Sequence, residues 1–244
     1  MTRKTYQIKI GTSGWFYQHW IERFYPKELH KSEWFKYFCG HFDTVEINNT
    51  FYHLPKQKTV ENWQKVSPKN FIFAVKASRF ITHIKRLKGI DEPLERFFEI
   101  AKLLKLKLGP ILFQLPPSLQ KNTELLSGFI EKLPRENTYV FEFRNQSWYG
   151  DETYALLDKN NIGICVHDMP GNPSPKIITG KIIYIRFHGL SGRYEGNYTE
   201  SMLNKWAGWI KKQKAKEIYA YFNNDYNAYA VSNAKQLKTM LRED

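Results

Sequence analysis

The chain has 244 residues, of which 42% are hydrophobic and 16% aromatic, and it carries a formal net charge of +13. This length and composition suit one folded domain and exclude a disordered chain, and no apolar run approaches the ~18 residues of a membrane helix. The positive charge has two interpretations, a solubilising surface or an anionic partner such as nucleic acid or a phosphorylated ligand.

Two further features bear on the cellular compartment. The first residues lead almost directly into a strand-like run, so we expect no signal peptide. The two cysteines, Cys39 and Cys165, have neither a CxxC motif nor a zinc-ligand spacing. The sequence therefore predicts a reduced, cytoplasmic protein without a structural disulfide, a cofactor or a membrane partner, and it leaves the oligomeric state open.

Eight short runs have the length and composition of β-strands. They are Gln7–Gly11, Thr44–Ile47, Phe71–Ala77, Ile111–Gln114, Tyr139–Phe143, Gly163–Val166, Ile182–Phe187 and Glu217–Phe222. Helical patterns follow all of them except the sixth, which leads into the Pro- and Gly-rich loop Met169–Pro175. The helical patterns are Ser32–Phe38, Thr59–Val66, Pro93–Leu104, Asn122–Leu133, Thr153–Lys159, Glu200–Lys211 and Ala228–Leu241. This alternation predicts an α/β protein, a single-domain (β/α)8 TIM barrel over residues 1–244 with eight parallel strands inside a ring of helices.

The fifth run suggests how such strands are oriented. Aromatic side chains occupy every second position from Tyr139 to Phe143, and the alternate positions end in Glu142 and Arg144. Because successive side chains of a strand point to opposite faces, we expect the aromatic face to pack under the helices and the charged face to line the barrel axis. The charged end is then the C-terminal end, where barrels of this kind carry their chemistry.

The same pattern recurs at the C-terminal ends of other strands. We therefore expect one set of polar side chains to meet at the barrel mouth: Glu46, Lys76, Gln114, Glu142, Arg144, Arg186, His188 and Asn223. A metal site is not expected there, because the cations would repel a divalent ion.

We divide the polar residues into two groups by the chemistry that each side chain offers. The candidate catalytic group is Glu46, Lys76, Glu142, Asp168 and His188. A carboxylate tuned by a neighbouring cation is a candidate general acid or base, and Lys76 is either an anion clamp or an amine nucleophile. Two structural alternatives stay open: Glu142 and Arg144 form an internal ion pair, and Asp168 belongs to a turn.

The second group consists of candidate ligand-binding residues. These are Asn48, Gln114, Arg144, Arg186, Tyr194, Asn223 and Asn224. The segments after the seventh and eighth strands are the usual phosphate site of this fold, and Arg186 would suit a phosphate. The alternative is that Asn224 or Asp225 caps the last helix.

Several motifs, taken together and in order, resemble the YecE-like family, also called domain of unknown function 72. They are Gly11-Thr-Ser-Gly-Trp15 with Trp20 and Phe24-Tyr-Pro26, Val45-Glu-Ile-Asn-Asn-Thr-Phe-Tyr52, Phe73-Ala-Val-Lys76 with Thr82-His83, Leu112-Phe-Gln-Leu-Pro-Pro117, Glu142-Phe-Arg144 with Ser147-Trp148, Arg186-Phe-His-Gly189 and Phe222-Asn-Asn224. The resemblance covers nearly the whole chain and implies a TIM barrel, but it implies no established activity. The fold is similar to that of endonuclease IV, which is an analogy of fold alone.

Three functions are compatible with these residues. The first is metal-independent acid–base catalysis on a small phosphorylated or carboxylated substrate. The second is binding or processing of nucleic acid, which the positive charge and the aromatic residues of the loops would serve. The third is a barrel that binds an anion without catalysis.

Overall fold

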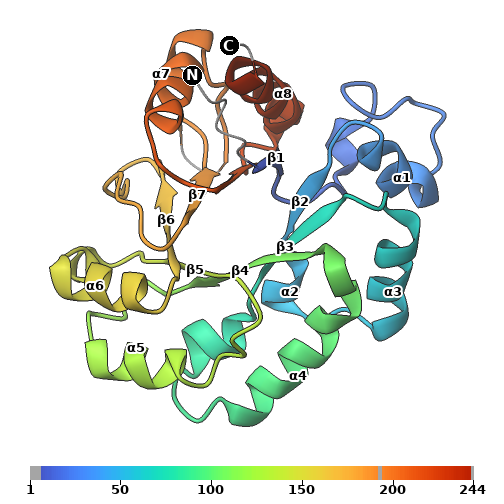
Figure 1. The fold of residues 1–244 in the computed structure, drawn as a ribbon. Coiled ribbons are helices and arrows are strands. Elements are labelled where there is room, and N and C mark those ends of the chain that lie inside the picture. Colours follow the sequence, from blue (N-terminus) through green and yellow to red (C-terminus); the bar gives the residue numbers. More distant parts are fainter. Residues whose placement is uncertain (1–6, 192–193, 243–244) are drawn as a thin grey trace.

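The protein is a parallel β-barrel surrounded by helices (Figure 1). The computed structural model describes residues 7–191 and 194–242. Within them the strands are β1 (Gln7–Thr12), β2 (Thr44–Ile47), β3 (Ile72–Lys76), β4 (Leu108–Gln114), β5 (Tyr139–Glu142), β6 (Gly163–His167), β7 (Ile182–Phe187) and β8 (Glu217–Phe222). Every strand is parallel to its neighbours in the order β1-β8-β7-β6-β5-β4-β3-β2, which confirms the predicted TIM barrel.

The barrel is nearly closed between β1 and β2, just past the end of β1. Ser13 forms a parallel bridge with Glu46, and the amide of Gly14 donates a 2.9 Å hydrogen bond to the carbonyl of Glu46. Gly11 allows the close approach, because a Cβ there would lie 2.4 Å from the carbonyl oxygen of Thr44. Gly14 has a φ of +88°, a left-handed conformation that favours glycine over other residues.

The helices lie around the outside of the strands (Figure 1). The α-helices are α1 (Trp34–Cys39), α2 (Asn49–Tyr52), α3 (Gln57–Val66), α4 (Asp91–Ala101), α5 (Thr123–Ile130), α6 (Asp151–Lys159), α7 (Glu200–Lys211) and α8 (Tyr229–Arg242). Short 3-10 segments lie at Gln18–Trp20, Lys31–Glu33, Lys102–Lys107, Gln146–Trp148 and Tyr226–Ala228, and Phe80–Ile84 is a single π-helical turn. No helix in the described part of the chain is long and apolar enough to span a bilayer.

The helix and strand predictions were correct in order and type, with shifted ends. Asn122 caps α5 as expected, since its side chain accepts a 2.8 Å hydrogen bond from the amide of Leu125. The prediction that a helix continues to Leu104 was wrong: α4 ends at Ala101, and the chain continues as a 3-10 segment in which Lys105 has a φ of +54°. Between β6 and β7 no helix was predicted and none forms.

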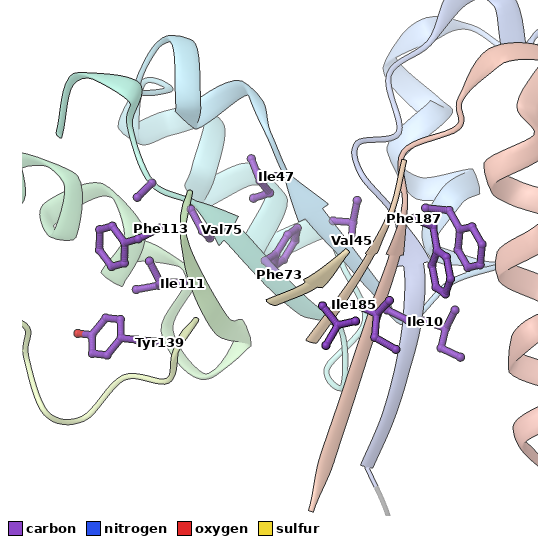
Figure 2. Close-up of a cluster of buried hydrophobic side chains, with 14 of the residues drawn as sticks. Ile10, Val45, Ile47, Phe73, Val75, Ile111, Phe113, Tyr139, Ile185 and Phe187 are labelled. Carbon is purple, nitrogen blue, oxygen red and sulfur yellow. The ribbon is translucent and has the colours of Figure 1, made fainter. Parts of the chain in front are cut away.

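The outward faces of the strands form the main hydrophobic core. Figure 2 shows part of this core, with Val45, Phe73, Ile111, Phe113 and Phe187 among the labelled side chains. Tyr139, Phe141 and Phe143 also belong to it, so the aromatic face of β5 packs outward under the helices as predicted. The charged face of β5 is thereby directed to the barrel axis.

The inward faces divide the barrel interior into two parts. The lower part is an apolar plug made of Ala74, Leu112, Val140, Cys165, Ile182, Tyr184, Tyr219 and Tyr221. Two residues further along several of these strands the inward side chains become charged or polar. The plug fills the lower part of the barrel interior, beneath the charged residues of the C-terminal mouth.

Candidate functional site

Directly above the plug lies a buried ion pair between β2 and β7. Arg186 donates from Nε to Oε2 of Glu46 at 3.0 Å and from Nη2 to Oε1 at 2.9 Å. Two neutral donors complete the shell of this carboxylate: the hydroxyls of Ser13 and Tyr184 each donate to it at 2.6 Å. Glu46 is fully buried, and each of its carboxylate oxygens accepts hydrogen bonds from Arg186 and from one hydroxyl group.

Arg186 also joins a second carboxylate. Its Nη1 donates to Oε2 of Glu142 at 2.7 Å, and the guanidinium of Arg144 donates to Oε1 of Glu142. Burial alone would raise the pKa of Glu142, but Arg144 and Arg186 outweigh burial and hold that pKa well below its usual value. Glu142 is therefore ionised, and guanidinium groups contact both carboxylates.

His188 lies between the two arginines in one defined protonation state. Its Nε2 is 2.8 Å from Nη2 of Arg144 and 3.4 Å from Nη1 of Arg186. Because a guanidinium can only donate, Nε2 must be the acceptor, so the ring is neutral and carries its proton on Nδ1. Burial and Arg186 lower the pKa of His188 well below its usual value, in agreement with that assignment.

Lys76 is the least satisfied charged group of the mouth. It lies at the end of β3, is 8% exposed, and its Nζ has neither a hydrogen bond nor an ion pair to a described residue. Its contact is with the face of the Phe51 ring, whose centroid is 4.0 Å from Nζ. Burial, followed by repulsion from Arg186, lowers the pKa of Lys76 to about 7.

Two asparagines lie at the mouth, where they directly follow β2 and β8. Nδ2 of Asn48 lies 3.5 Å from Oδ1 of Asn223, and Oδ1 of Asn48 and Nδ2 of Asn223 are buried without a partner. Gln114 ends β4 beside Glu142 in the strand register, and it is partly exposed. The structure thus places the eight residues that were predicted to meet at the mouth at or just past the C-terminal ends of their strands.

Two predicted site residues instead have structural contacts. Asp168 accepts from the His188 amide at 2.8 Å and from the hydroxyl of Tyr198, so it fastens the end of β6 to the segment after β7. Burial raises the pKa of Asp168 to about 6, against the opposing effect of these donors. Asn224 is fully buried, and its Nδ2 donates at 2.9 Å to the carbonyl of Gly196 and to Oδ1 of Asn233 on α8.

The predicted phosphate site is described only in part. Tyr194 is half exposed, and its ring centroid lies 6.2 Å from that of His188. Gly192 and Arg193 of the same loop lie outside the described residues. After β8, the side chains of Asn224 and Asp225 form no described capping bond to a helix. The catalytic and ligand-binding roles of all these residues stay predictions.

Sequence reasoning missed several neighbours of the predicted site. Ser13 and Tyr184 bind the carboxylate of Glu46, and Phe51 contacts the ammonium of Lys76. Tyr184 shares the two-residue strand period of Arg186, which was a usable signal. Ser13 and Phe51 lie beyond strand ends, where no periodicity exists to place them.

The described residues include no group of three or more His, Cys, Asp or Glu side chains that could hold a metal ion. The carboxylates most central to the mouth are already bound by Arg144 and Arg186.

The fold and the mouth define a TIM-barrel protein with a buried, arginine-neutralised carboxylate pair at its C-terminal face. Comparison with family models matches residues 9–244 to "Protein of unknown function DUF72", so the chain belongs to this family. The protein YunF of Bacillus subtilis is 25% identical over 96% of this chain and 94% of its own length. YecE of Escherichia coli K12 is 28% identical over 61% of this chain and 53% of its own length.

Solved structures show the same fold. A DUF72 family protein of Thermotoga maritima is 32% identical and superposes with a TM-score of 0.88, covering 98% of this chain and all of the other. One from Enterococcus faecalis has a TM-score of 0.82 at 22% identity, covering 98% and 96%. The structure of SacUVDE, at 7% identity and a TM-score of 0.55, covers 96% and 99% and resembles the chain in fold alone.

Proposed function

We propose that the protein is a metal-independent acid–base enzyme whose barrel mouth binds a small phosphorylated or carboxylated substrate. The observation that carries the proposal is Lys76, a residue 8% exposed at the mouth whose amine contacts the Phe51 ring and has no hydrogen-bond partner among the described residues. A buried charge without a partner is costly to keep, so such a group is a candidate for binding or catalysis.

The formal charges of the mouth support an anionic ligand. Arg144 and Arg186 balance Glu46 and Glu142, so these four residues sum to zero. A protonated Lys76 adds one positive charge, and it forms no ion pair with a described residue. A phosphate or carboxylate beside Lys76 supplies the missing negative charge and favours the ammonium form.

The protonation equilibrium of Lys76 suits proton transfer. Its pKa of about 7 lies near neutral pH, where a group exists in both forms and can accept and return a proton. The amine is therefore the candidate base for a substrate proton, and the ammonium is the candidate acid. Glu46 and Glu142, each bound by guanidinium groups, are better suited to fixing Arg186 than to taking a proton.

Solvent exchange tests this proposal. The enzyme is incubated in D2O with a panel of sugar phosphates, keto acids and hydroxy acids, and deuterium on substrate carbon is followed by NMR. We expect exchange at one carbon of one compound class, abolished in Lys76→Met and retained in the exposed control Lys58→Met. Exchange at an equal rate in Lys76→Met would remove Lys76 from the chemistry. Tight binding without exchange would favour the non-catalytic barrel. Unchanged exchange after metal depletion with a chelator is expected as well.

A second candidate function, nucleic-acid binding, is favoured by aromatic side chains around the mouth. Phe16, Tyr52, Phe80, Tyr194 and Tyr226 are 42–61% exposed, and each lies in a segment after a strand. Exposed aromatic rings on a basic protein can stack on unpaired bases. The net charge of +13 would contribute a salt-dependent attraction to the phosphate backbone.

Fluorescence anisotropy with a labelled single-stranded oligonucleotide tests this candidate. It predicts that log K falls linearly with log salt, and that the double substitution Tyr52→Ala/Phe80→Ala weakens binding about tenfold or more. Leu106→Ala is the matched control, because Leu106 is 97% exposed and precedes β4, at the opposite end of the barrel. Equal affinity of the double variant and the control would exclude stacking on Tyr52 and Phe80.

A further inference from the structure

The asparagine pair at the mouth has hydrogen-bonding capacity that the protein leaves unused. Oδ1 of Asn48 and Nδ2 of Asn223 are both buried and unpartnered, and the Asn223 side chain belongs to a residue that is only 7% exposed. Their single mutual contact, from Nδ2 of Asn48 to Oδ1 of Asn223, is 3.5 Å long. Unpaired buried amide groups cost free energy, so such a pair calls for an external partner.

The free capacity does not depend on how the two amides are oriented. If both amides are turned over, the contact persists with donor and acceptor exchanged, and again one N–H group and one carbonyl oxygen remain free. A group that is both donor and acceptor satisfies both atoms. A hydroxyl is the simplest such group, since it has one O–H and two lone pairs.

Strand register places this pair between the other mouth residues. Ile47 is level with Val75, so the next residues, Asn48 and Lys76, leave adjacent strands at one height. Phe187 is likewise level with Phe222, so His188 and Asn223 leave β7 and β8 at one height. Lys76, Asn48, Asn223 and His188 therefore form an arc around the mouth.

His188 adds a third unused group to this arc. Its Nδ1 is buried without a partner, and the tautomer set by Arg144 and Arg186 makes it a donor. The arc thus runs from a cation through a donor–acceptor pair to a further donor. A matching ligand has an acidic group at one end, which would pair with Lys76. It has hydroxyl or carbonyl oxygens along a short carbon chain, which would pair with the asparagines and His188.

We propose that the ligand carries at least one hydroxyl on the carbons next to its acidic group, and that Asn48 and Asn223 bind this hydroxyl. The ligand is then a hydroxylated phosphate ester or hydroxy acid rather than a bare anion. This inference rests on the anion site proposed at Lys76. The two asparagines would select hydroxylated anions over other anions, which the Lys76 ammonium alone does not distinguish.

Calorimetry with matched phosphate esters tests the assignment. Glycerol 3-phosphate and propyl phosphate have equal carbon chains and the same acidic group, and they differ in two hydroxyls. We expect wild-type protein to bind glycerol 3-phosphate about tenfold tighter or more, since one or more net hydrogen bonds are gained. The double variant Asn48→Leu/Asn223→Leu should bind both esters with the affinity that wild type has for propyl phosphate.

Asn62→Leu is the control, because Asn62 is an exposed asparagine on α3. It should keep the wild-type preference. Equal affinity of the wild type for both esters would overturn the hydroxyl assignment and leave the anion site standing. The same comparison is made between glycerate and propionate, and binding of none of the four compounds would overturn both proposals. A preference that survives in the double variant would place hydroxyl recognition elsewhere in the mouth. Thermal unfolding of the double variant confirms that it is folded, and we expect no loss of stability because both amides are replaced together.

Discussion

Arg186 forms a bidentate contact with the carboxylate of Glu46 in the barrel interior, with Nε to Oε2 at 3.0 Å and Nη2 to Oε1 at 2.9 Å. The same guanidinium reaches Glu142 at 2.7 Å, so one buried cation joins β2, β5 and β7. Such a centre fixes the geometry of the mouth, because removing Arg186 leaves Glu46 without its guanidinium and Glu142 with only one of its two.

Removing Arg186 should therefore destabilise the fold strongly. Arg186→Met leaves Glu46 and Glu142 buried, with Arg144 as the remaining guanidinium partner of Glu142, and a broken buried pair costs about 3–5 kcal/mol. For a protein of this size we expect the melting temperature to fall by ~6–20 °C. The control is Lys132→Met, which breaks an exposed pair with Asp91 and should cost at most about 1 kcal/mol. Similar small losses in both variants would contradict a tightly coupled ionic centre.

Removing Lys76, in contrast to removing Arg186, should stabilise the fold, and by an amount that depends on pH. Its pKa in the folded protein is about 7 against an ordinary 10.5, so between these values the unfolded chain binds more protons and stability rises with pH. Below about pH 7 the ammonium is charged in both states and its burial is fully unfavourable. Lys76→Met should thus be more stable than wild type, most clearly at low pH, with the difference shrinking by about 1.4 kcal/mol per pH unit as pH rises above 7.

Denaturant unfolding of wild type and Lys76→Met at several pH values between about 6 and 9 measures that difference. Lys58→Met removes an exposed lysine and should follow the wild-type curve throughout. A constant difference across this range would show that Lys76 titrates normally in the folded protein.

The two thiols should react slowly in the folded protein. Burial raises the pKa of Cys39 to about 12 and that of Cys165 well above its usual value, and the thiolate is the reactive form. We expect a disulfide reagent near pH 8 to label neither cysteine until denaturant is added. Fast labelling of Cys165 would mean that the barrel plug opens on the timescale of the reaction.

The barrel was predictable because its signals are local. Each strand has its own alternation of apolar and polar residues, and the position of Glu142 and Arg144 on β5 already shows which end carries the charges. Even the meeting of residues at the mouth follows from that alternation together with barrel closure. The pairing of charges does not, since Arg186 binds Glu46 from 140 positions away and the pairing depends on strand register.

Other features of the fold could not be predicted, because they leave no recognisable pattern in the sequence. The helix α2 (Asn49–Tyr52) and the π-turn Phe80–Ile84 are too short to show a helical period. β4 begins at Leu108, three residues before the run that was predicted. The prediction began too late because Gly109 and Pro110 resemble a turn in sequence. The interpretation of Asn224 as a helix cap or a ligand residue could not anticipate its bond to Asn233, which packing of α8 creates.

If an anion binds at the mouth beside Lys76, the amine of Lys76 must take up a proton as the anion binds, and this uptake can be measured. Sulfate is titrated into the protein at about pH 8 in two buffers of different ionisation enthalpy, and the difference in heat gives the number of protons taken up. Sulfate itself does not titrate in this range. With a free pKa of about 7, Lys76 is mostly neutral at the start, so the account predicts uptake of close to one proton, which falls toward zero at about pH 6 and is absent in Lys76→Met. Sulfate binding without proton uptake, or with equal uptake in Lys76→Met, would contradict it.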